Sequence, residues 1–183
     1  GVLLQKLISS GKDAFASNSA KDYLEVCITT TKRTLQLLCY SFISKLWDFK
    51  KDNNCDLSRD QLNILDNFFF FLIELNIKDY VELFNSLVNI FDAQKMEYPF
   101  SEFDKDWLKE DSSFIKACKS LENINSKLDS GQFTLSTAFE AENELTVFLS
   151  TLNFLAGYKM VSVKDISYEE VRNKNAQYLH SYT

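Results

Sequence analysis

The sequence is poor in glycine, proline and histidine, with four, one and one of them in 183 residues. Glycine and proline supply most tight turns, so their scarcity favours a few long helices over many short strands. Four glycines also leave little material for a phosphate-binding loop, and no glycine-rich nucleotide motif is present. A single histidine excludes an H-E-x-x-H zinc site.

Positive charge is in deficit as well, because 26 acidic residues face 20 basic ones and the formal net charge is −6. A broad nucleic-acid or anionic-lipid surface needs a surplus of Lys and Arg, so the charge argues against both partners. The four cysteines form no C-x-x-C pair, which argues against a zinc site and a redox dithiol. We interpret them as thiols in a reducing, cytoplasmic compartment. They are Cys27, Cys39, Cys55 and Cys118.

Long hydrophobic runs are missing too. The most apolar stretch, "FFFFLIEL", is interrupted by Glu74 and falls far short of the ~20 residues that span a membrane. No basic-then-apolar signal peptide opens the chain, so no membrane association is expected. Because the chain opens with "GVLLQKL" and ends in a strand-like segment at Thr183, we expect a piece of a longer protein.

The spacing of apolar residues predicts helices instead. A short helix is expected at residues 2–8, and long ones over residues 21–49, 58–75, from about 79, 113–128 and 134–156. Ser58 and Gln61 form a capping box at the start of one of them, and Asp79 is the expected cap of the next. In the last helix we expect five apolar residues to face the core: Leu135, Phe139, Leu145, Leu149 and Leu152.

Beyond Gly157 the pattern changes to period two, in "YKMVSVKDI" and "AQYLHSYT". We therefore predict a mainly α fold, a bundle of five or six helices with a small C-terminal β-hairpin or two short strands. The predicted organisation is a helical bundle at residues 1–157 and a small β element at 158–183. This element is expected to pack on the bundle within the same domain. Whether the sequence contains the whole of the element stays open.

Aromatic residues gather in the segment "MEYPFSEFDKDW", which also holds the sole proline. Aromatic side chains are enriched among the buried anchors of protein interfaces, so this segment is the candidate partner-binding site. The alternative is that the segment crosses one end of the bundle and closes it. The candidate site residues are Tyr98, Phe100, Phe103 and Trp107.

Two charged stretches are candidate ligand sites. Glu140 and Glu144 share a helix face, but a di-metal site would need Glu-x-x-His partners, and the chain has one histidine. Lysines around Trp47 resemble a single-strand nucleic-acid surface, but neighbouring Asp48 and Asp52 neutralise much of it. Both stretches are interpreted as solvated helix faces, and no metal or cofactor is predicted.

The C-terminal stretch "RNKNAQYLH" brings Arg172 and Asn173 near His180. An Arg, a polar residue and a His in this order resemble the motif of HEPN-class helical ribonucleases, although the spacing here is wider than in that family. The resemblance implies a dimeric ribonuclease or toxin domain, with Arg172 and His180 on one helix lining the dimer cleft. A strand at this position would favour a structural histidine instead.

Taken together, these patterns predict a non-catalytic protein-interaction or scaffold module of a larger cytoplasmic protein. Its partner would be another protein or a flanking domain of the same chain, and a homo-oligomer stays open. The alternative is the HEPN-like ribonuclease. The module has no residue assigned to catalysis, whereas the ribonuclease would use Arg172 and His180.

Overall fold

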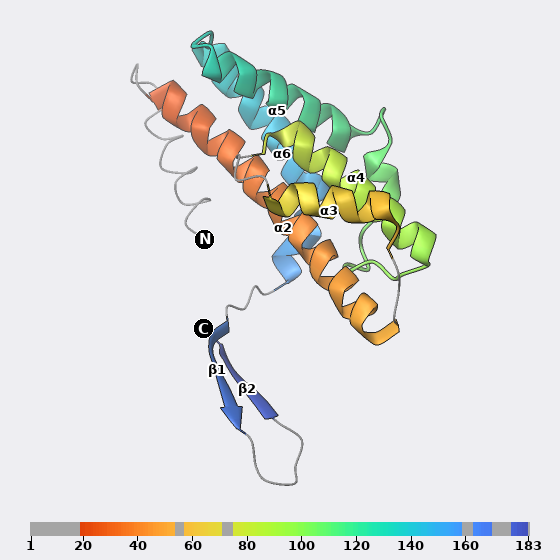
Figure 1. Ribbon diagram of the computed structural model, residues 1–183. Coiled ribbons are helices and arrows are strands. Elements are labelled where there is room, and N and C mark those ends of the chain that lie inside the picture. Colours follow the sequence, from red (N-terminus) through yellow and green to blue (C-terminus); the bar gives the residue numbers. More distant parts are fainter. Residues whose placement is uncertain (1–18, 54–56, 71–74, 159–162, 170–176, 183) are drawn as a thin grey trace. The chain divides into compact units, whose positions relative to one another are not determined.

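The structure is a computed structural model that describes residues 19–53, 57–70, 75–158, 163–169 and 177–182 (Figure 1). The described residues form the α-helices α2 (Ser19–Asn53), α3 (Arg59–Phe70), α4 (Ile77–Gln94), α5 (Ser113–Asp129) and α6 (Leu135–Thr151). Two short 3-10 helices, η1 (Lys105–Leu108) and η2 (Asn153–Gly157), follow α4 and α6. The helix predicted at residues 2–8 lies outside the described residues.

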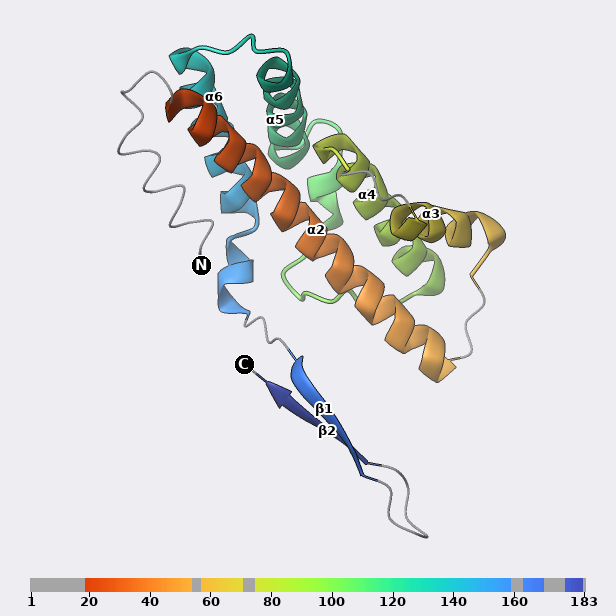
Figure 2. The ribbon, with the colours of Figure 1, turned by 60° about the vertical axis from the view of Figure 1, so that its left-hand side comes forward.

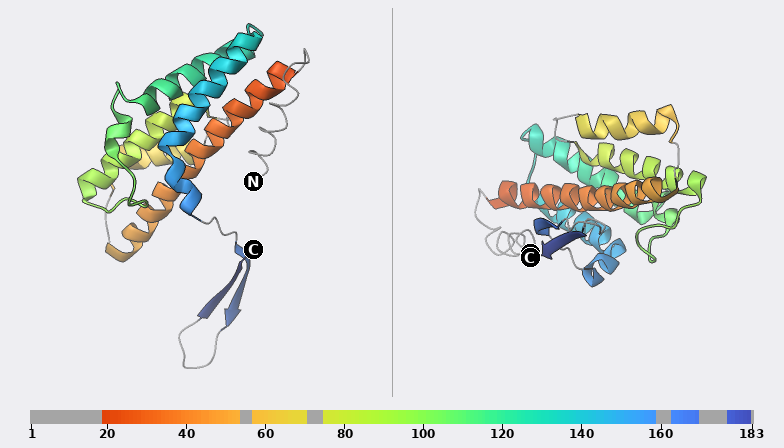
Figure 3. Two further views of the ribbon diagram at one scale, coloured as in Figure 1. Left: turned by 180° about the vertical axis from the view of Figure 1, so that it is seen from behind. Right: turned by 60° about the horizontal axis from the view of Figure 1, so that its bottom comes forward.

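The 35-residue helix α2 is the centre of the bundle and contacts α4, α5 and α6. Figures 2 and 3 show α3 and α6 on opposite sides of it. The apolar residues that recur at helical spacing along α2 are buried, which confirms the predicted central helix. They are Leu24, Ile28, Leu35, Leu38, Phe42 and Leu46.

The helix starts follow from side-chain caps. Gln61 N donates to Ser58 Oγ at 3.3 Å and Ser58 N donates to Gln61 Oε1 at 2.9 Å, which confirms the predicted capping box. The predicted cap of α4 was wrong by three residues. Asn76 is the cap, and Asp79 is the N3 partner whose carboxylate accepts from Asn76 N at 3.1 Å.

Helices α5 and α6 form a contacting pair joined by a short turn. Gly131 follows α5 with a φ of 70°, a left-handed conformation that glycine adopts without strain, as the sequence predicted. Helix α6 ends at Thr151, earlier than the predicted residue 156. The expectation that Leu135 and Phe139 face the core was also wrong, because their exposed fractions are 42% and 52%.

The predicted fold class, a bundle that includes a C-terminal hairpin, is corrected to an all-α bundle. Strands β1 (Val163–Glu169) and β2 (Gln177–Tyr182) pair antiparallel, but in a separate compact unit, Leu152–Thr183. Every residue of the described core lies between Tyr23 and Leu152, in the helices and in the segments that join them. A lone pair of strands has too little surface to form a core of its own. That the β element belongs to the same domain stays a prediction.

Candidate functional site

The aromatic segment between α4 and α5 lies against the core of the bundle. Phe103 is buried, and its ring centroid lies 5.4 Å from that of Phe42 and 5.5 Å from that of Phe84. Tyr98 and Trp107 flank Phe103, with ring centroids 4.8 Å and 5.5 Å away. These mostly edge-to-face contacts are the arrangements that aromatic rings favour. The rings that were predicted to bind a partner therefore also hold this segment against the bundle.

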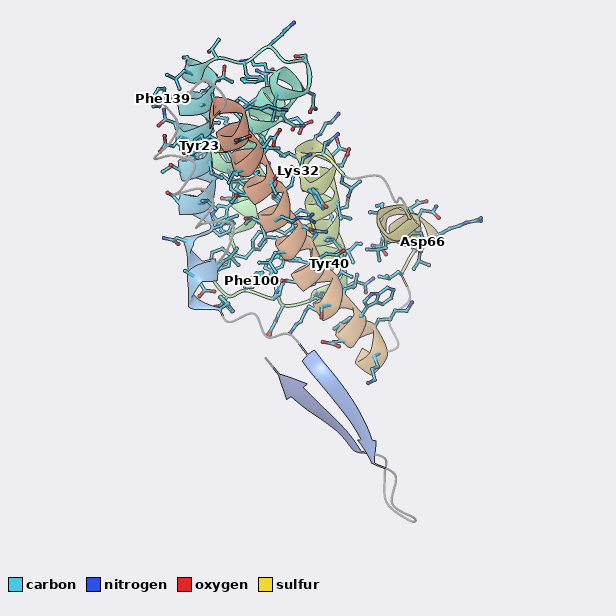
Figure 4. The ribbon with its side chains drawn as sticks, turned by 90° about the vertical axis from the view of Figure 1, so that its left-hand side faces the viewer. Tyr23, Lys32, Tyr40, Asp66, Phe100 and Phe139 are labelled. Atoms are coloured by element: carbon cyan, nitrogen blue, oxygen red, sulfur yellow. The ribbon has the colours of Figure 1, made fainter. Side chains whose placement is uncertain are left out.

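The four predicted site residues are thus not equally accessible. Phe100 and Phe103 are buried, each with 8% of its surface exposed, while Tyr98 and Trp107 are half-buried (Phe100 is labelled in Figure 4). Partner binding by this segment stays a prediction. Tyr98 and Trp107 are the two residues that a partner could reach without rearrangement of the core.

A polar contact ties the same segment to the end of α4. The Tyr98 hydroxyl donates to Asp92 Oδ1 at 2.5 Å, and Lys105 Nζ lies 3.4 Å from Asp92 Oδ2. The Tyr98 hydrogen bond, assisted by Lys105, lowers the pKa of Asp92 below its ordinary value. Burial and the Asp92 carboxylate raise the pKa of Tyr98 to about 12. Both groups therefore keep their ordinary charge at neutral pH, and the contact positions the segment.

A groove of about 310 Å³ lies between α4 and α5. Its apolar floor combines Ile77 and Val81 from α4 with Ile115 and Cys118 from α5, and four charged residues rim it. We call this the α4–α5 groove. Its lining is Ile77, Lys78, Val81, Glu82, Ile115, Cys118, Lys119 and Glu122.

The rim of the α4–α5 groove carries both signs of charge. Lys78 Nζ lies 3.7 Å from Glu82 Oε1 along α4, and Lys119 Nζ pairs with Glu110 at 3.1 Å. Glu122 Oε2 accepts a hydrogen bond from Ile77 N at 3.0 Å, so a carboxylate of α5 satisfies a free amide in the first turn of α4. This bond holds the two walls of the groove together.

The described cysteines are apolar core groups rather than nucleophiles. Burial raises the pKa of the Cys118 thiol to about 12, and it likewise raises the pKa of Cys27 to about 12. Burial also raises the pKa of Cys39, whose Sγ contacts Tyr80 O at 3.7 Å. A thiol must ionise to attack, so these three are inert at neutral pH. Among the described residues no group of His, Cys, Asp or Glu could hold a metal ion.

The residues of the ribonuclease alternative fall in the C-terminal unit. Arg172 and Asn173 lie outside the described residues, whereas His180 belongs to β2, where its backbone stands opposite Ile166. The HEPN resemblance implies a helix at His180. The described backbone there is a strand.

Sequence reasoning missed the α4–α5 groove. Tyr80, Phe84, Leu87, Val88 and Phe91 were predicted as the apolar stripe of α4, and all five are buried. The groove lies beside this stripe, where half-buried Val81 follows Ile77 by one turn. A second, shorter apolar row at i and i+4 flanked by charges was the signal that could have found it.

Comparisons of the chain with protein-family models, curated proteins and solved structures give no significant match. Its function is therefore argued from its own residues. None of the helices that the structure describes has the length and apolar character needed to cross a membrane.

Proposed function

We propose that the chain is a non-catalytic protein-interaction module of a larger cytoplasmic protein, and that the α4–α5 groove holds an amphipathic helix of a partner. The observation that carries the proposal is the groove itself, an apolar floor between two helices with charged residues on both rims. A helix that lays its apolar face into such a groove is a recurring mode of recognition.

The charge pattern of the rim favours a helix over a small anionic amphiphile. Lys78 and Glu82 alternate along α4, and Lys119 and Glu122 alternate along α5. A fatty acid would bring its carboxylate close to Glu82 or Glu122, whereas a helix can present lysine to glutamate and glutamate to lysine along its length. The two helices run in roughly opposite directions, so a partner helix could lie between them (Figure 1).

Two further features support the proposal. The described cysteines Cys27, Cys39 and Cys118 are free thiols, in keeping with a cytoplasmic setting. Half-buried Trp107, beyond the aromatic segment's buried rings, adds a residue type enriched at interface hot spots. A homo-oligomer, in which the partner helix comes from a second copy, is a form of the same proposal.

The experiment compares Val81→Asp with Asn89→Asp in the full chain. Val81 lines the groove, whereas Asn89 is exposed on α4 outside its lining. Affinity capture from cell extract, followed by mass spectrometry, should identify a protein that binds the wild type and Asn89→Asp and is lost with Val81→Asp. Identical sets of proteins for all three chains would refute the proposal, provided that circular dichroism shows both variants folded.

A further inference from the structure

The exposed side of α2 carries aromatic and cationic side chains in one stripe. Arg33, Tyr40 and Trp47 follow one another at intervals of seven residues, which places them almost in line along the helix. All three are exposed, and the exposed fractions of Tyr40 and Trp47 are 46% and 42%. Three lysines flank this line within about 100° of arc around α2. We call the surface the α2 stripe, and its members are Lys32, Arg33, Tyr40, Trp47, Lys50 and Lys51 (Lys32 and Tyr40 are labelled in Figure 4).

The cations of the α2 stripe have no carboxylate partner in the described part of the chain. No ion pair there involves any of them, although lysines of α4 and α5 are paired. Arg33 Nη1 instead donates to Gln36 Oε1 at 2.7 Å, and Lys50 Nζ lies over the Trp47 ring, 5.4 Å from its centroid. A lysine over an aromatic ring keeps its charge. The stripe is therefore a positive surface on a chain whose formal net charge is −6.

The nearest acidic residues along α2 do not belong to the stripe. Asp48 is exposed and lies about 100° around the helix from Trp47 and about 60° beyond Lys51. Asp52 follows Asp48 by one turn, so the helical spacing places it on the same side. Asp48 is thus a neighbour of the lysines along the chain without being paired with them in the fold.

The cations occupy the two ends of the α2 stripe, and the aromatic rings occupy its middle. Lys32 and Arg33 stand at one end and Lys50 and Lys51 at the other, and the 17 positions from Arg33 to Lys50 correspond to about 25 Å of helix. Lys45, the one cation between them in sequence, lies on another side of α2 by its spacing. A single-stranded nucleic acid carries phosphates along its whole length and needs cations to match. The stripe lacks them in its middle.

We propose that the α2 stripe binds an acidic amphipathic helix of another protein. Apolar residues in the middle of that helix would cover the rings of Tyr40 and Trp47. Acidic residues about 25 Å apart would pair with the cations at the two ends. Residues that recur every seven positions stay in line with a neighbouring helix, so α2 and its partner keep contact over this length. Arginine and tryptophan are also enriched among the residues that contribute most to binding at interfaces.

Charge selects against a second copy bound stripe to stripe, because like charges would meet at both ends. The α2 stripe also shares no residue with the α4–α5 groove. The two surfaces lie on different helices, so the failure of one proposal leaves the other standing.

A synthetic peptide of about 25 residues tests the proposal, with leucines on one side of its central turns and glutamates at both ends. Fluorescence anisotropy of the labelled peptide is measured while the full chain is added. The peptide control is an isomer of the same composition whose leucines are spread around the helix. The amphipathic peptide should bind about tenfold or more tightly than the isomer. Its affinity should fall as the salt concentration rises, because the charge pairs are exposed.

Variants of the chain locate the binding. Trp47→Ala should weaken it about tenfold or more, and Arg33→Glu about fivefold or more. The matched control for the charge reversal is Lys116→Glu, at an exposed position of α5 outside both surfaces, and it should change the affinity by less than about twofold. Val81→Asp, in the α4–α5 groove, should leave the affinity unchanged. Circular dichroism checks that each variant is folded.

Four results would overturn the proposal. Equal affinities for the two peptides would remove the amphipathic partner, and equal losses in Arg33→Glu and Lys116→Glu would reduce the effect to overall charge. Loss of binding in Val81→Asp would assign the peptide to the α4–α5 groove. An oligothymidine that binds more tightly than the peptide, and is lost with Trp47→Ala, would assign the stripe to nucleic acid.

Discussion

Around Phe42 the phenylalanine rings are all buried, whereas helix α6 buries one of its two phenylalanines and exposes the other. Phe42 is fully buried, and its ring centroid lies 5.0 Å from that of Phe84 and 4.9 Å from that of Phe91. On α6, Phe148 is fully buried while Phe139 is half exposed. A helical apolar period therefore does not by itself decide which side is buried. Which side of a helix is buried also depends on how closely the neighbouring helices approach it.

The largest effect is expected where the rings converge. Phe42→Ala removes contacts with three other phenylalanine rings and should lower the free energy of unfolding by about 3–5 kcal/mol. Ser44→Ala, at an exposed position two residues further along α2, should change it by less than about 0.5 kcal/mol. Urea denaturation followed by circular dichroism measures both. Equal costs for the two variants would contradict the packing around Phe42.

The two phenylalanines of α6 offer the sharpest internal comparison. Phe148→Ala should cost about 3–5 kcal/mol of unfolding free energy, because it leaves a cavity beside Phe114. Phe139→Ala should cost about 1 kcal/mol, since roughly half of its surface already meets water in the described part of the chain. Thermal and urea unfolding of the pair would show the order. A larger cost for Phe139→Ala would mean that α6 is turned the other way.

A smaller effect is expected at the contact between Tyr98 and Asp92. The hydrogen bond lowers the pKa of Asp92 in the folded state, so its contribution to stability is complete above the unfolded pKa of about 3.9. It is lost as the pH falls through the folded pKa. Tyr98→Phe should raise the pKa of Asp92 in an NMR titration of its carboxyl group. An unchanged pKa would mean that the bond does not form in solution.

His180→Ala is expected to cause no change in an RNA cleavage assay. The strand at His180 does not offer the helix that the ribonuclease motif needs, so the wild type and this variant should both leave RNA intact. A cleavage time course at low salt measures this directly. Cleavage by the wild type that His180→Ala abolishes would establish the ribonuclease alternative.

Local signals in the sequence were sufficient for much of the bundle. The capping box of Ser58 and Gln61, the left-handed Gly131 and the buried stripe of α4 each depend on neighbours within one or two turns. Such features are encoded locally, so the sequence predicts them. The prediction of Asp79 as the cap of α4 was wrong, but Asp79 belongs to the same capping box as the true cap, Asn76.

Features that depend on distant neighbours could not be predicted in this way. Phe103 meets Phe42 and Phe84 across long sequence separations, so an aromatic loop looked like a partner-binding surface. Leu135 and Phe139 were predicted to face the core because they are apolar, but the buried positions of α6 near them are those of the small residues Ala138 and Ala141. The α4–α5 groove is likewise a product of two helices, and neither helix predicts it alone.

The central claim is that the α4–α5 groove holds a partner's helix, and site-specific photo-crosslinking tests it most directly. A photoreactive benzoylphenylalanine at position 81 should give one defined adduct in cells, while the same group at exposed position 89 should give none. Mapping of the adduct to an amphipathic helix of another protein, or of a second copy, is the predicted result. No adduct at position 81, or the same adducts at both positions, would contradict the claim.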